Sequence, residues 1–310
     1  MRAPESFFPV KHFGAVKSVT PVSGGLSGAA VFAVTTETGE FFLRRNAPGQ
    51  EGFGTMLTAQ RLAAKAGIAP SVIFADEELG VVVTEKAPGI SIGAALAQPE
   101  ARLQALRGVA ETLARLHAIA APDLPPSDPA LAQSIWDRQS ARDGFPQWAR
   151  PLGVCIAAGD DALAGDPRRV FGHNDVNPAN LIWDGAKVWM VDWERAALAH
   201  PYMDLAIFSI FAILSDDDAI ALLSLQEGSA IEAGERQVFL LLRNYGRAIY
   251  GAVLFRLIPD LTAITFLPRD KTATLAECYG LLGKGALDLG TPAGQALLGA
   301  AILGQGHTAG

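Results

Sequence analysis

The feature that most constrains the fold of this chain is a polar loop followed by an apolar hairpin and an acidic turn. The loop covers residues 173–180 and reads His-Asn-Asp-Val-Asn-Pro-Ala-Asn. Apolar residues on either side of the turn pair Asp184-Gly185 then predict a β-hairpin. A hairpin here returns Asp192 to the neighbourhood of Asn180. The sequence therefore places a carboxylate and an amide together at the open end of one hairpin.

Three side chains around this hairpin suit one kind of chemistry. Asp175, Asn180 and Asp192 are the residue types that ATP-dependent phosphoryl transfer requires from one loop and its flanking strand. Asp175 can orient and accept the proton of an acceptor hydroxyl, whereas Asn180 and Asp192 offer the oxygen ligands that Mg²⁺ prefers. Taken singly, Asn, Asp and Pro are ordinary turn formers. Their joint placement favours the catalytic interpretation, with ATP and Mg²⁺ as the predicted cofactors.

The stretch of residues 171–206 resembles the catalytic and metal loops of the aminoglycoside phosphotransferase and choline/thiamine kinase families, which are small-molecule relatives of protein kinases. Those families share His-x-Asp-x-x-x-x-Asn, then an apolar strand and an Asp-x-Glu element, which occupies residues 192–194 here. The resemblance implies that Asp175 is the catalytic base. It also implies that His173 belongs to the catalytic loop, which its ring anchors through hydrogen bonds.

The resemblance further assigns a metal site and a supporting acid. The expected metal group consists of Asn180, Asp192 and Glu194. Two roles stay open for Glu194: it supports the metal ligands without binding the metal itself, or it contacts the acceptor. Asp204 follows a family-like His-Pro-Tyr-Met segment, and relatives use the equivalent Asp to brace the catalytic loop. By its position alone, Asp204 is predicted to cap the apolar helix of residues 205–214.

Three short strands are predicted near the N-terminus, over residues 16–22, 31–36 and 41–45. A glycine-rich turn between the first two could bring backbone amides over nucleotide phosphates. Its assigned residues are Ser23, Gly24, Gly25, Ser27 and Gly28. In the third strand, alternation puts Arg44 and Arg45 on opposite faces. The resemblance implies that one arginine binds the α- and β-phosphates; Arg44 is the assignment, and Arg45 is the alternative if the register shifts by one.

A helix is predicted over residues 54–66, where apolar side chains recur at helical spacing. The resembling families usually carry a Glu near the start of this helix, paired with the cation of the strand. The expected position here is Thr55 or Met56, and the nearest acid is Glu51. Two possibilities stay open: Glu51 reaches in from a shifted helix start, or phosphate alone holds Arg44.

A break at residues 86–89, Lys-Ala-Pro-Gly, predicts a hinge. The resemblance implies that main-chain atoms of Glu85 and Ala87 bind adenine there. It implies an α+β, protein-kinase-like fold with a small antiparallel-sheet lobe in residues 1–86, a larger helical lobe in residues 87–310, and ATP between them. Further helices are predicted over residues 99–119, 235–257 and 272–289, followed by a frayed, Gly/Ala-rich C-terminus.

Composition limits location and partners. Half of the 310 residues are hydrophobic and 18% are charged, which excludes large-scale disorder. The first ten residues lack a secretory signal. The apolar run of residues 205–214 is too short to cross a bilayer. The two cysteines, Cys155 and Cys278, fit no disulfide framework or metal motif. We therefore expect a cytoplasmic enzyme without membrane association. Residues 1–86 carry eight basic and eight acidic side chains, so the net charge of −7 falls in residues 87–310, which argues against nucleic acid.

The same acidic balance favours a cationic acceptor. The predicted function is transfer of the γ-phosphate of ATP to a hydroxyl of a small cationic molecule of choline/ethanolamine or thiamine type. Such a cation would use aromatic faces, for which the chain offers Trp136, Trp148, Trp193, Tyr245 and Tyr250.

One alternative is an aminoglycoside phosphotransferase, with the acidic run of residues 216–218 as a contact. Another is a non-catalytic, kinase-like nucleotide-binding regulator, suggested by the missing helix Glu. A metal-dependent hydrolase would need more metal ligands near Asp192, and the oligomeric state stays open.

Overall fold

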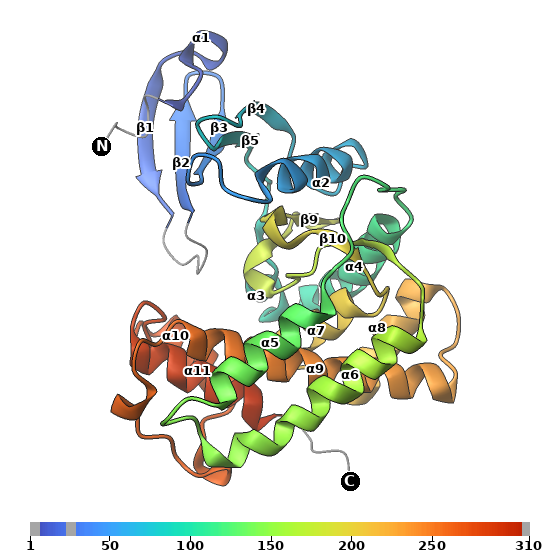
Figure 1. Cartoon of the computed structure of the whole chain (residues 1–310). Coiled ribbons are helices and arrows are strands. Elements are labelled where there is room, and N and C mark those ends of the chain that lie inside the picture. The colour runs from blue at the N-terminus through green and yellow to red at the C-terminus, as the bar shows by residue number, and fades with distance from the viewer. Residues whose placement is uncertain (1–6, 23–28, 306–310) are drawn as a thin grey trace. The chain divides into compact units, whose positions relative to one another are not determined.

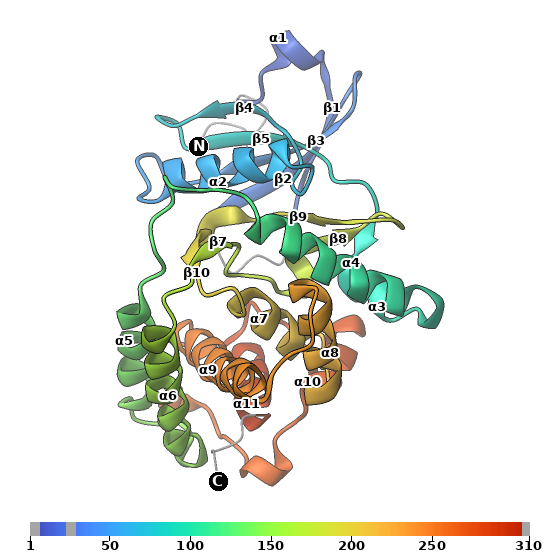
Figure 2. The same cartoon turned by 90° about the vertical axis from the view of Figure 1, so that its right-hand side faces the viewer.

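The computed structural model describes residues 7–22 and 29–305, and its contacts divide the chain into two compact units. The first unit combines Met1–Pro125 with Val170–Leu198, and the second combines Pro126–Arg169 with Ala199–Gly310. Figures 1 and 2 show the strand-rich first unit and the helical second unit. The polar loop and its hairpin therefore belong to the same compact unit as the N-terminal sheet. The predicted division of the lobes after residue 86 stays a prediction.

A five-stranded antiparallel sheet forms the N-terminal part of the first unit (Figure 1). Its order is β1-β2-β3-β5-β4, with strands β1 (Val16–Pro21), β2 (Ala30–Thr36), β3 (Glu40–Arg45), β4 (Val72–Asp76) and β5 (Val81–Glu85). Helix α1 (Val10–Phe13) precedes the sheet, and helix α2 (Phe53–Lys65) connects β3 to β4. The predicted α+β, protein-kinase-like class, with an antiparallel sheet and a helical remainder, is confirmed.

Strand β3 sorts its side chains between the core and the opposite face of the sheet. Leu43 is fully buried and packs with Val34 and Val83. Because successive strand residues point to opposite faces, burial of Leu43 turns Arg44 to the other face. The register pairs Arg44 with Val31 of β2 and with Val82 of β5. Arg44 thus lies in the middle of the sheet, on the face away from this apolar core.

The second part of the first unit carries the predicted hairpin, which is confirmed. Strands β8 (Leu181–Trp183) and β9 (Val188–Met190) pair antiparallel, and β6 (Ile90–Ser91) joins them at the edge of β8. The Asp184 carboxylate closes the turn by accepting hydrogen bonds from the backbone amides of Ala186 and Lys187, both at 2.9 Å. The remaining elements are helices α3 (Ile92–Leu96) and α4 (Pro99–His117), strands β7 (Val170–Gly172) and β10 (Ala197–Ala199), and the 3-10 turns η3 (Pro178–Asn180) and η4 (Trp193–Arg195).

Gly89, in the predicted hinge, is required by a close approach of two backbones. Its φ is 108°, and a Cβ atom there would lie 2.1 Å from the carbonyl oxygen of Trp183. No side chain fits at that distance, so glycine lets the segment before β6 pack against the hairpin. The hinge sequence thus has a structural role beside its predicted one.

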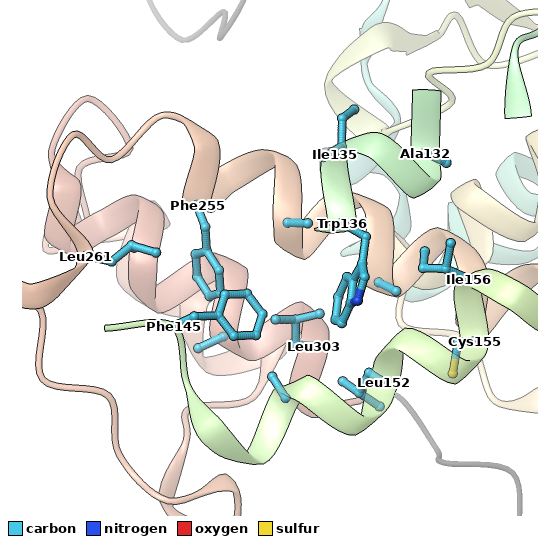
Figure 3. Close-up of a cluster of buried hydrophobic side chains, with 14 of the residues drawn as sticks. Ala132, Ile135, Trp136, Phe145, Leu152, Cys155, Ile156, Phe255, Leu261 and Leu303 are labelled. Atoms are coloured by element: carbon cyan, nitrogen blue, oxygen red, sulfur yellow. The ribbon is translucent and has the colours of Figure 1, made fainter. Parts of the chain in front are cut away.

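The second unit is built around the long helix α9 (Ala233–Arg256). It packs against α5 (Pro129–Ser140), α6 (Gly153–Gly165), α7 (Met203–Phe211) and α11 (Pro292–Gly304). The unit also contains η2 (Gln147–Leu152), α8 (Asp216–Glu227), η5 (Leu261–Ala263), η6 (Arg269–Lys271) and α10 (Leu275–Gly283). Figure 3 shows its core, where Phe145 meets Trp136 and Phe255 edge to face with ring centroids 5.8 and 5.6 Å apart. Edge-to-face pairs add to the stability that apolar burial supplies.

Three local predictions in this unit differ from the structure. Helix α7 begins at Met203 with Tyr202 as its N-cap, so Asp204 lies inside the first turn instead of capping it, and its side chain is buried. The Gly/Ala-rich C-terminus is helical over residues 292–304, which form α11, while residues 306–310 lie outside the described residues. The helix predicted over residues 272–289 is shorter and covers Leu275–Gly283. Small residues let α11 approach α9 closely, because a Cβ at Gly251 would lie 2.4 Å from the Leu303 side chain. Among the described residues, no helix combines the length and the apolar character needed to cross a membrane.

A cluster of charged side chains joins the two places where the chain leaves and re-enters the second unit. We name Asp166, Arg168 and His200 the junction cluster. Asp166 Oδ2 accepts hydrogen bonds from Arg168 Nη2 at 2.6 Å and from His200 Nε2 at 3.0 Å. The Arg168 guanidinium also lies 4.9 Å from the ring centre of Tyr202. The cluster ties together both ends of the inserted segment that carries the polar loop.

Candidate active site

The Asp175 carboxylate is held from two sides by its own loop. Its Oδ1 accepts a hydrogen bond from Asn177 Nδ2 at 3.1 Å, and its Oδ2 accepts one from Asn180 Nδ2 at 2.9 Å. Asn180 Nδ2 also donates to the backbone oxygen of Asp175 at 3.0 Å. These bonds fix the carboxylate and use the amide nitrogen of Asn180. The amide oxygen of Asn180 is thereby the atom that can serve a cation.

Two hydrogen bonds attach the loop to the end of the hairpin. His173 is fully buried, and its Nε2 donates to the backbone oxygen of Val191 at 3.0 Å. The amide of Val191 donates to the backbone oxygen of Asn180 at 3.0 Å. The His173 ring also meets the Trp193 ring edge to face, with centroids 4.6 Å apart. This geometry agrees with the anchoring role predicted for His173, and it places Asp192 beside Asn180.

Left-handed backbone at two non-glycine residues shapes the site. Asn174 has φ +60° and Asp192 has φ +67°. Asn and Asp tolerate this region better than most residues, but a residue held there still costs about 1–3 kcal/mol. The Asn174 side chain contributes support by donating to the backbone oxygens of Gly172 and Arg195, both at 3.3 Å. Sequence reasoning missed Asn174, although an Asn beside the loop His is a signal for left-handed backbone.

Arg44 reaches the acidic turn that follows the hairpin. Its Nη1 donates to Asp192 Oδ1 at 2.6 Å, and its Nη2 donates to Glu194 Oε2 in a short contact. Its Nε donates to Asn46 Oδ1 at 3.1 Å. Arg45 points elsewhere, with its guanidinium 4.5 Å from the ring centre of Phe7. The structure therefore brings Arg44, and not Arg45, to the predicted site, and Asn46 is a contact that the sequence did not indicate.

The electrostatics of this group are dominated by carboxylates. Burial raises the pKa of Glu194, and repulsion from Asp192 raises it further, while Arg44 offsets only part of the rise. Asp175 acts on Glu194 in the same direction as Asp192. Asp192 and Glu194 thus share one guanidinium in a partly buried site, and the charge of Asp175 also acts on Glu194. A site short of positive charge in this way favours a bound cation.

The donor set fits magnesium. In the described part of the chain, no three His, Cys, Asp or Glu side chains converge as a ready-made metal cage. Magnesium needs no such cage, because it keeps several waters and is bound by one or two carboxylates together with substrate phosphates. Asn180 Oδ1 and the Asp192 carboxylate supply oxygen ligands only, which excludes a soft-metal site.

The structure describes only some of the predicted nucleotide-binding residues. Ser23, Gly24, Gly25, Ser27 and Gly28 lie outside the described residues. Glu85 ends strand β5, and its backbone amide donates to the Ser71 carbonyl at 3.0 Å. Ala87 is buried between β5 and β6. Their contacts with adenine through main-chain atoms stay predictions.

The side chains that the sequence suggested for acceptor binding are packed in the protein core or paired with neighbouring side chains. Trp193 packs under the loop, and Trp136 and Tyr245 lie in the core of the helical unit. The other two aromatic residues, Trp148 and Tyr250, are partly buried against the apolar clusters of the same unit. The acidic run is also engaged: Asp216 pairs with Arg243, Asp217 with Arg236 at 2.8 Å, and Asp218 with Ser215 at 2.7 Å.

Comparisons with known proteins give one family match and several similar structures. Residues 18–238 match the model of the phosphotransferase enzyme family. A choline/ethanolamine kinase family protein from Mesorhizobium loti has a similar structure, with a TM-score of 0.69, 19% identity and 96% of each chain covered. A spectinomycin phosphotransferase in complex with ADP and spectinomycin gives a TM-score of 0.64 at 13% identity, covering 98% of this chain and 99% of that chain. Choline kinase from Streptococcus pneumoniae gives 0.59 at 15% identity, covering 79% and 86%. No curated protein matches the chain significantly.

Proposed function

Because the chain belongs to the phosphotransferase enzyme family, we propose that it transfers the γ-phosphoryl group of ATP to a hydroxyl group of a small molecule. The observation that carries the proposal is the fixed Asp175 carboxylate beside an oxygen-donor pair. Asn177 and Asn180 hold that carboxylate at 3.1 and 2.9 Å, and the amide of Val191, the residue before Asp192, donates to the backbone oxygen of Asn180 at 3.0 Å. A base and a magnesium site on one short segment are what phosphoryl transfer requires.

Each residue has one part in the proposed mechanism. Asp175 orients the acceptor hydroxyl and takes its proton as the oxygen bonds to the γ-phosphorus and the bond from that phosphorus to the ADP oxygen breaks. Asn180 and Asp192 would hold magnesium, which would supply positive charge to the phosphates when bound. Arg44 and the turn at residues 23–28 bind phosphates, and the backbone of Glu85 and Ala87 binds adenine. Positioning and charge neutralisation supply most of the rate.

We keep a cationic alcohol of choline/ethanolamine or thiamine type as the first candidate acceptor. The net charge of −7 confined to residues 87–310 supports a cation, and two of the similar structures are named for choline or ethanolamine kinases. An aminoglycoside is the second candidate. The engagement of Asp216, Asp217 and Asp218 by neighbouring side chains disfavours the acidic run as its binding site. A cytoplasmic location, where ATP is available, is part of the same proposal.

A nucleotide-binding regulator without turnover is the competing function. It would bind MgATP but release no ADP in response to any acceptor. The test is a panel of hydroxyl compounds with ATP and magnesium: choline, ethanolamine, thiamine, an aminoglycoside and a neutral sugar. ADP release coupled to phosphorylation of one acceptor supports the kinase. MgATP binding without ADP release across the panel supports the regulator.

Ionic strength separates the acceptor classes within that panel. If a cationic acceptor is drawn in by an acidic surface, its Michaelis constant rises with salt, because salt screens attraction beyond a Debye length of about 8–10 Å. A neutral sugar should show no such rise. A clear preference for the neutral sugar would remove the cation from the proposal and leave the kinase in place.

A further inference from the structure

Helix α2 contains no acid that could pair with Arg44. Its residues, Phe53–Lys65, include neither Asp nor Glu. Glu51, just before the helix, is exposed. In protein kinases the strand cation is held by an acid from the corresponding helix, and both must be in place for activity. The cation of this chain therefore needs a partner from another element.

The partner comes from the turn that follows the metal strand. Glu194 lies in η4, which packs directly against α2. Its Oε2 accepts a hydrogen bond from Arg44 Nη2, across 150 residues of sequence. The side chains of Arg44 and Glu194 are 13% and 28% exposed, so water screens the pair only in part. An ion pair with such limited exposure holds its geometry better than a surface pair.

Three contacts fix the plane of the Arg44 guanidinium. Asn46 accepts from Nε at 3.1 Å, Asp192 accepts from Nη1 at 2.6 Å, and Glu194 accepts from Nη2. Asn46 is itself held, because its Nδ2 donates to Gln50 Oε1 at 3.1 Å. A guanidinium has five N–H groups in a rigid fork. These contacts use three, and they leave one N–H on each terminal nitrogen for phosphate oxygens.

We propose that Glu194 is the positioning residue for Arg44, taking the place of the acid that α2 lacks, so that Arg44 presents its two remaining N–H groups to the phosphates of ATP. This inference rests on the proposed function. It gives Glu194 a role different from the two expected for it, at the metal and at the acceptor. Asp192 then serves both the metal and Arg44, whereas Glu194 serves Arg44 alone.

Metal binding and nucleotide binding separate this role from that of a metal ligand. In Glu194→Gln, the affinity for Mn²⁺ without nucleotide, measured by electron paramagnetic resonance, should stay within about twofold of the native value. The affinity for MgATP, measured by calorimetry, should fall roughly tenfold, because one charge-assisted contact is worth about that factor. If the Mn²⁺ affinity falls as far as the MgATP affinity and added metal restores MgATP binding, Glu194 is a metal ligand and the proposal is wrong.

A double-mutant cycle tests whether Glu194 acts through Arg44. Removing the guanidinium in Arg44→Gln should weaken MgATP binding, and adding Glu194→Gln to that variant should weaken it little further. Additive losses would show that Glu194 acts independently of Arg44. Asn46→Ala provides a milder variant in case Glu194→Gln folds poorly: it should weaken MgATP binding without changing Mn²⁺ affinity. Equal MgATP affinity in Asn46→Ala and the native protein would also contradict the proposal.

The cycle also distinguishes failure of this inference from failure of the proposed function. If the native protein binds no MgATP, the proposed function fails and the cycle has no signal. If the native protein binds MgATP and phosphorylates an acceptor but the two losses are additive, only the positioning role of Glu194 fails. Thermal unfolding of each variant confirms that the comparison is made between folded proteins.

Discussion

The active-site group and the junction cluster use similar residues in opposite proportions. At the active site, Asp192 and Glu194 share the guanidinium of Arg44. In the junction cluster, Asp166 alone receives hydrogen bonds from Arg168 and His200. Burial raises the pKa of Glu194 and repulsion from Asp192 adds to it, whereas the hydrogen bond from Arg168 holds the pKa of Asp166 well below its usual range. The group around Arg44 therefore has more carboxylates than cations, whereas the junction cluster does not.

This difference indicates that the group around Arg44 binds a ligand, whereas the junction cluster contributes to the stability of the fold. A carboxylate whose pKa is raised by burial and a like charge is typical of a functional site, where a missing cation is supplied by a ligand. A carboxylate surrounded by its own donors needs nothing further and contributes to structure. Ion pairs alone would not separate the two, because both groups contain a short arginine contact. The ratio of carboxylates to cations does.

The largest expected effect is on turnover at Asp175. Asp175→Asn should reduce turnover by roughly 100-fold or more, since general-base help is typically worth 10²–10⁴. MgATP binding should be retained, because Asp175 is not assigned to the metal. Steady-state kinetics and calorimetry on the same preparation check both statements. Asp123→Asn, an exposed aspartate of the same unit, is the matched control and should keep native turnover.

A smaller effect is expected at Asn180, which serves both the metal and the base. Asn180→Ala should weaken MgATP binding roughly tenfold and lower turnover, and excess magnesium should restore binding but not turnover. The difference arises because Asn180 Nδ2 also holds Asp175 Oδ2 at 2.9 Å. Titration of magnesium at fixed ATP measures the first effect. If magnesium restores turnover as well, the bond to Asp175 is unimportant for the base.

Removing the junction carboxylate should affect stability and leave chemistry largely intact. In Asp166→Asn the hydrogen bonds to Arg168 and His200 lose their charge, and we expect a loss of about 1 kcal/mol in the free energy of unfolding, because the group is partly exposed. Turnover per folded molecule should change less than about twofold. Urea unfolding and kinetics decide the matter. A loss of turnover as large as that in Asp175→Asn would erase the contrast between the clusters.

The smallest expected effect is a pH dependence of stability that comes from His200. Burial lowers the pKa of His200 below its ordinary value of about 6.5. The unfolded chain then takes up this proton more readily than the folded chain, so stability is complete above the ordinary value and is lost as the pH falls toward the folded value. Asp166, whose pKa is also lowered, adds a loss only below about pH 3.9. Urea unfolding at about pH 7.5 and 5.5 should show this loss, and His200→Gln should reduce it.

Local patterns in the sequence predicted the parts of the site that depend on local geometry. The hairpin followed from apolar residues around Asp184-Gly185, and alternation along β3 put Arg44 and Arg45 on opposite faces, of which the structure brings Arg44 to the site. The same hairpin was expected to return Asp192 to Asn180, and the amide of the preceding Val191 donates to the backbone oxygen of Asn180 at 3.0 Å. In each case the periodicity of a strand or the length of a turn decides which side chains meet.

Contacts between distant segments were beyond such reasoning. Arg44 meets Asp192 across 148 residues, and no local pattern indicates that Glu194 replaces the acid of α2. The apolar run after Asp204 predicts that this residue is a cap, but helix ends vary by one or two residues, and here the helix begins at Met203. The Gly/Ala-rich residues of α11 suggest a frayed end until their packing on α9 is known.

Magnesium-dependent nucleotide binding at Asp192 tests the central claim most directly. The measurement is calorimetric titration of ATP with and without magnesium into the native protein, Asp192→Ala and the matched control Asp166→Ala, which removes the arginine-paired carboxylate of the junction cluster. We predict that magnesium strengthens ATP binding in the native protein and in Asp166→Ala and has no effect in Asp192→Ala. Unchanged MgATP binding in Asp192→Ala would contradict the account, because the metal would then lie elsewhere.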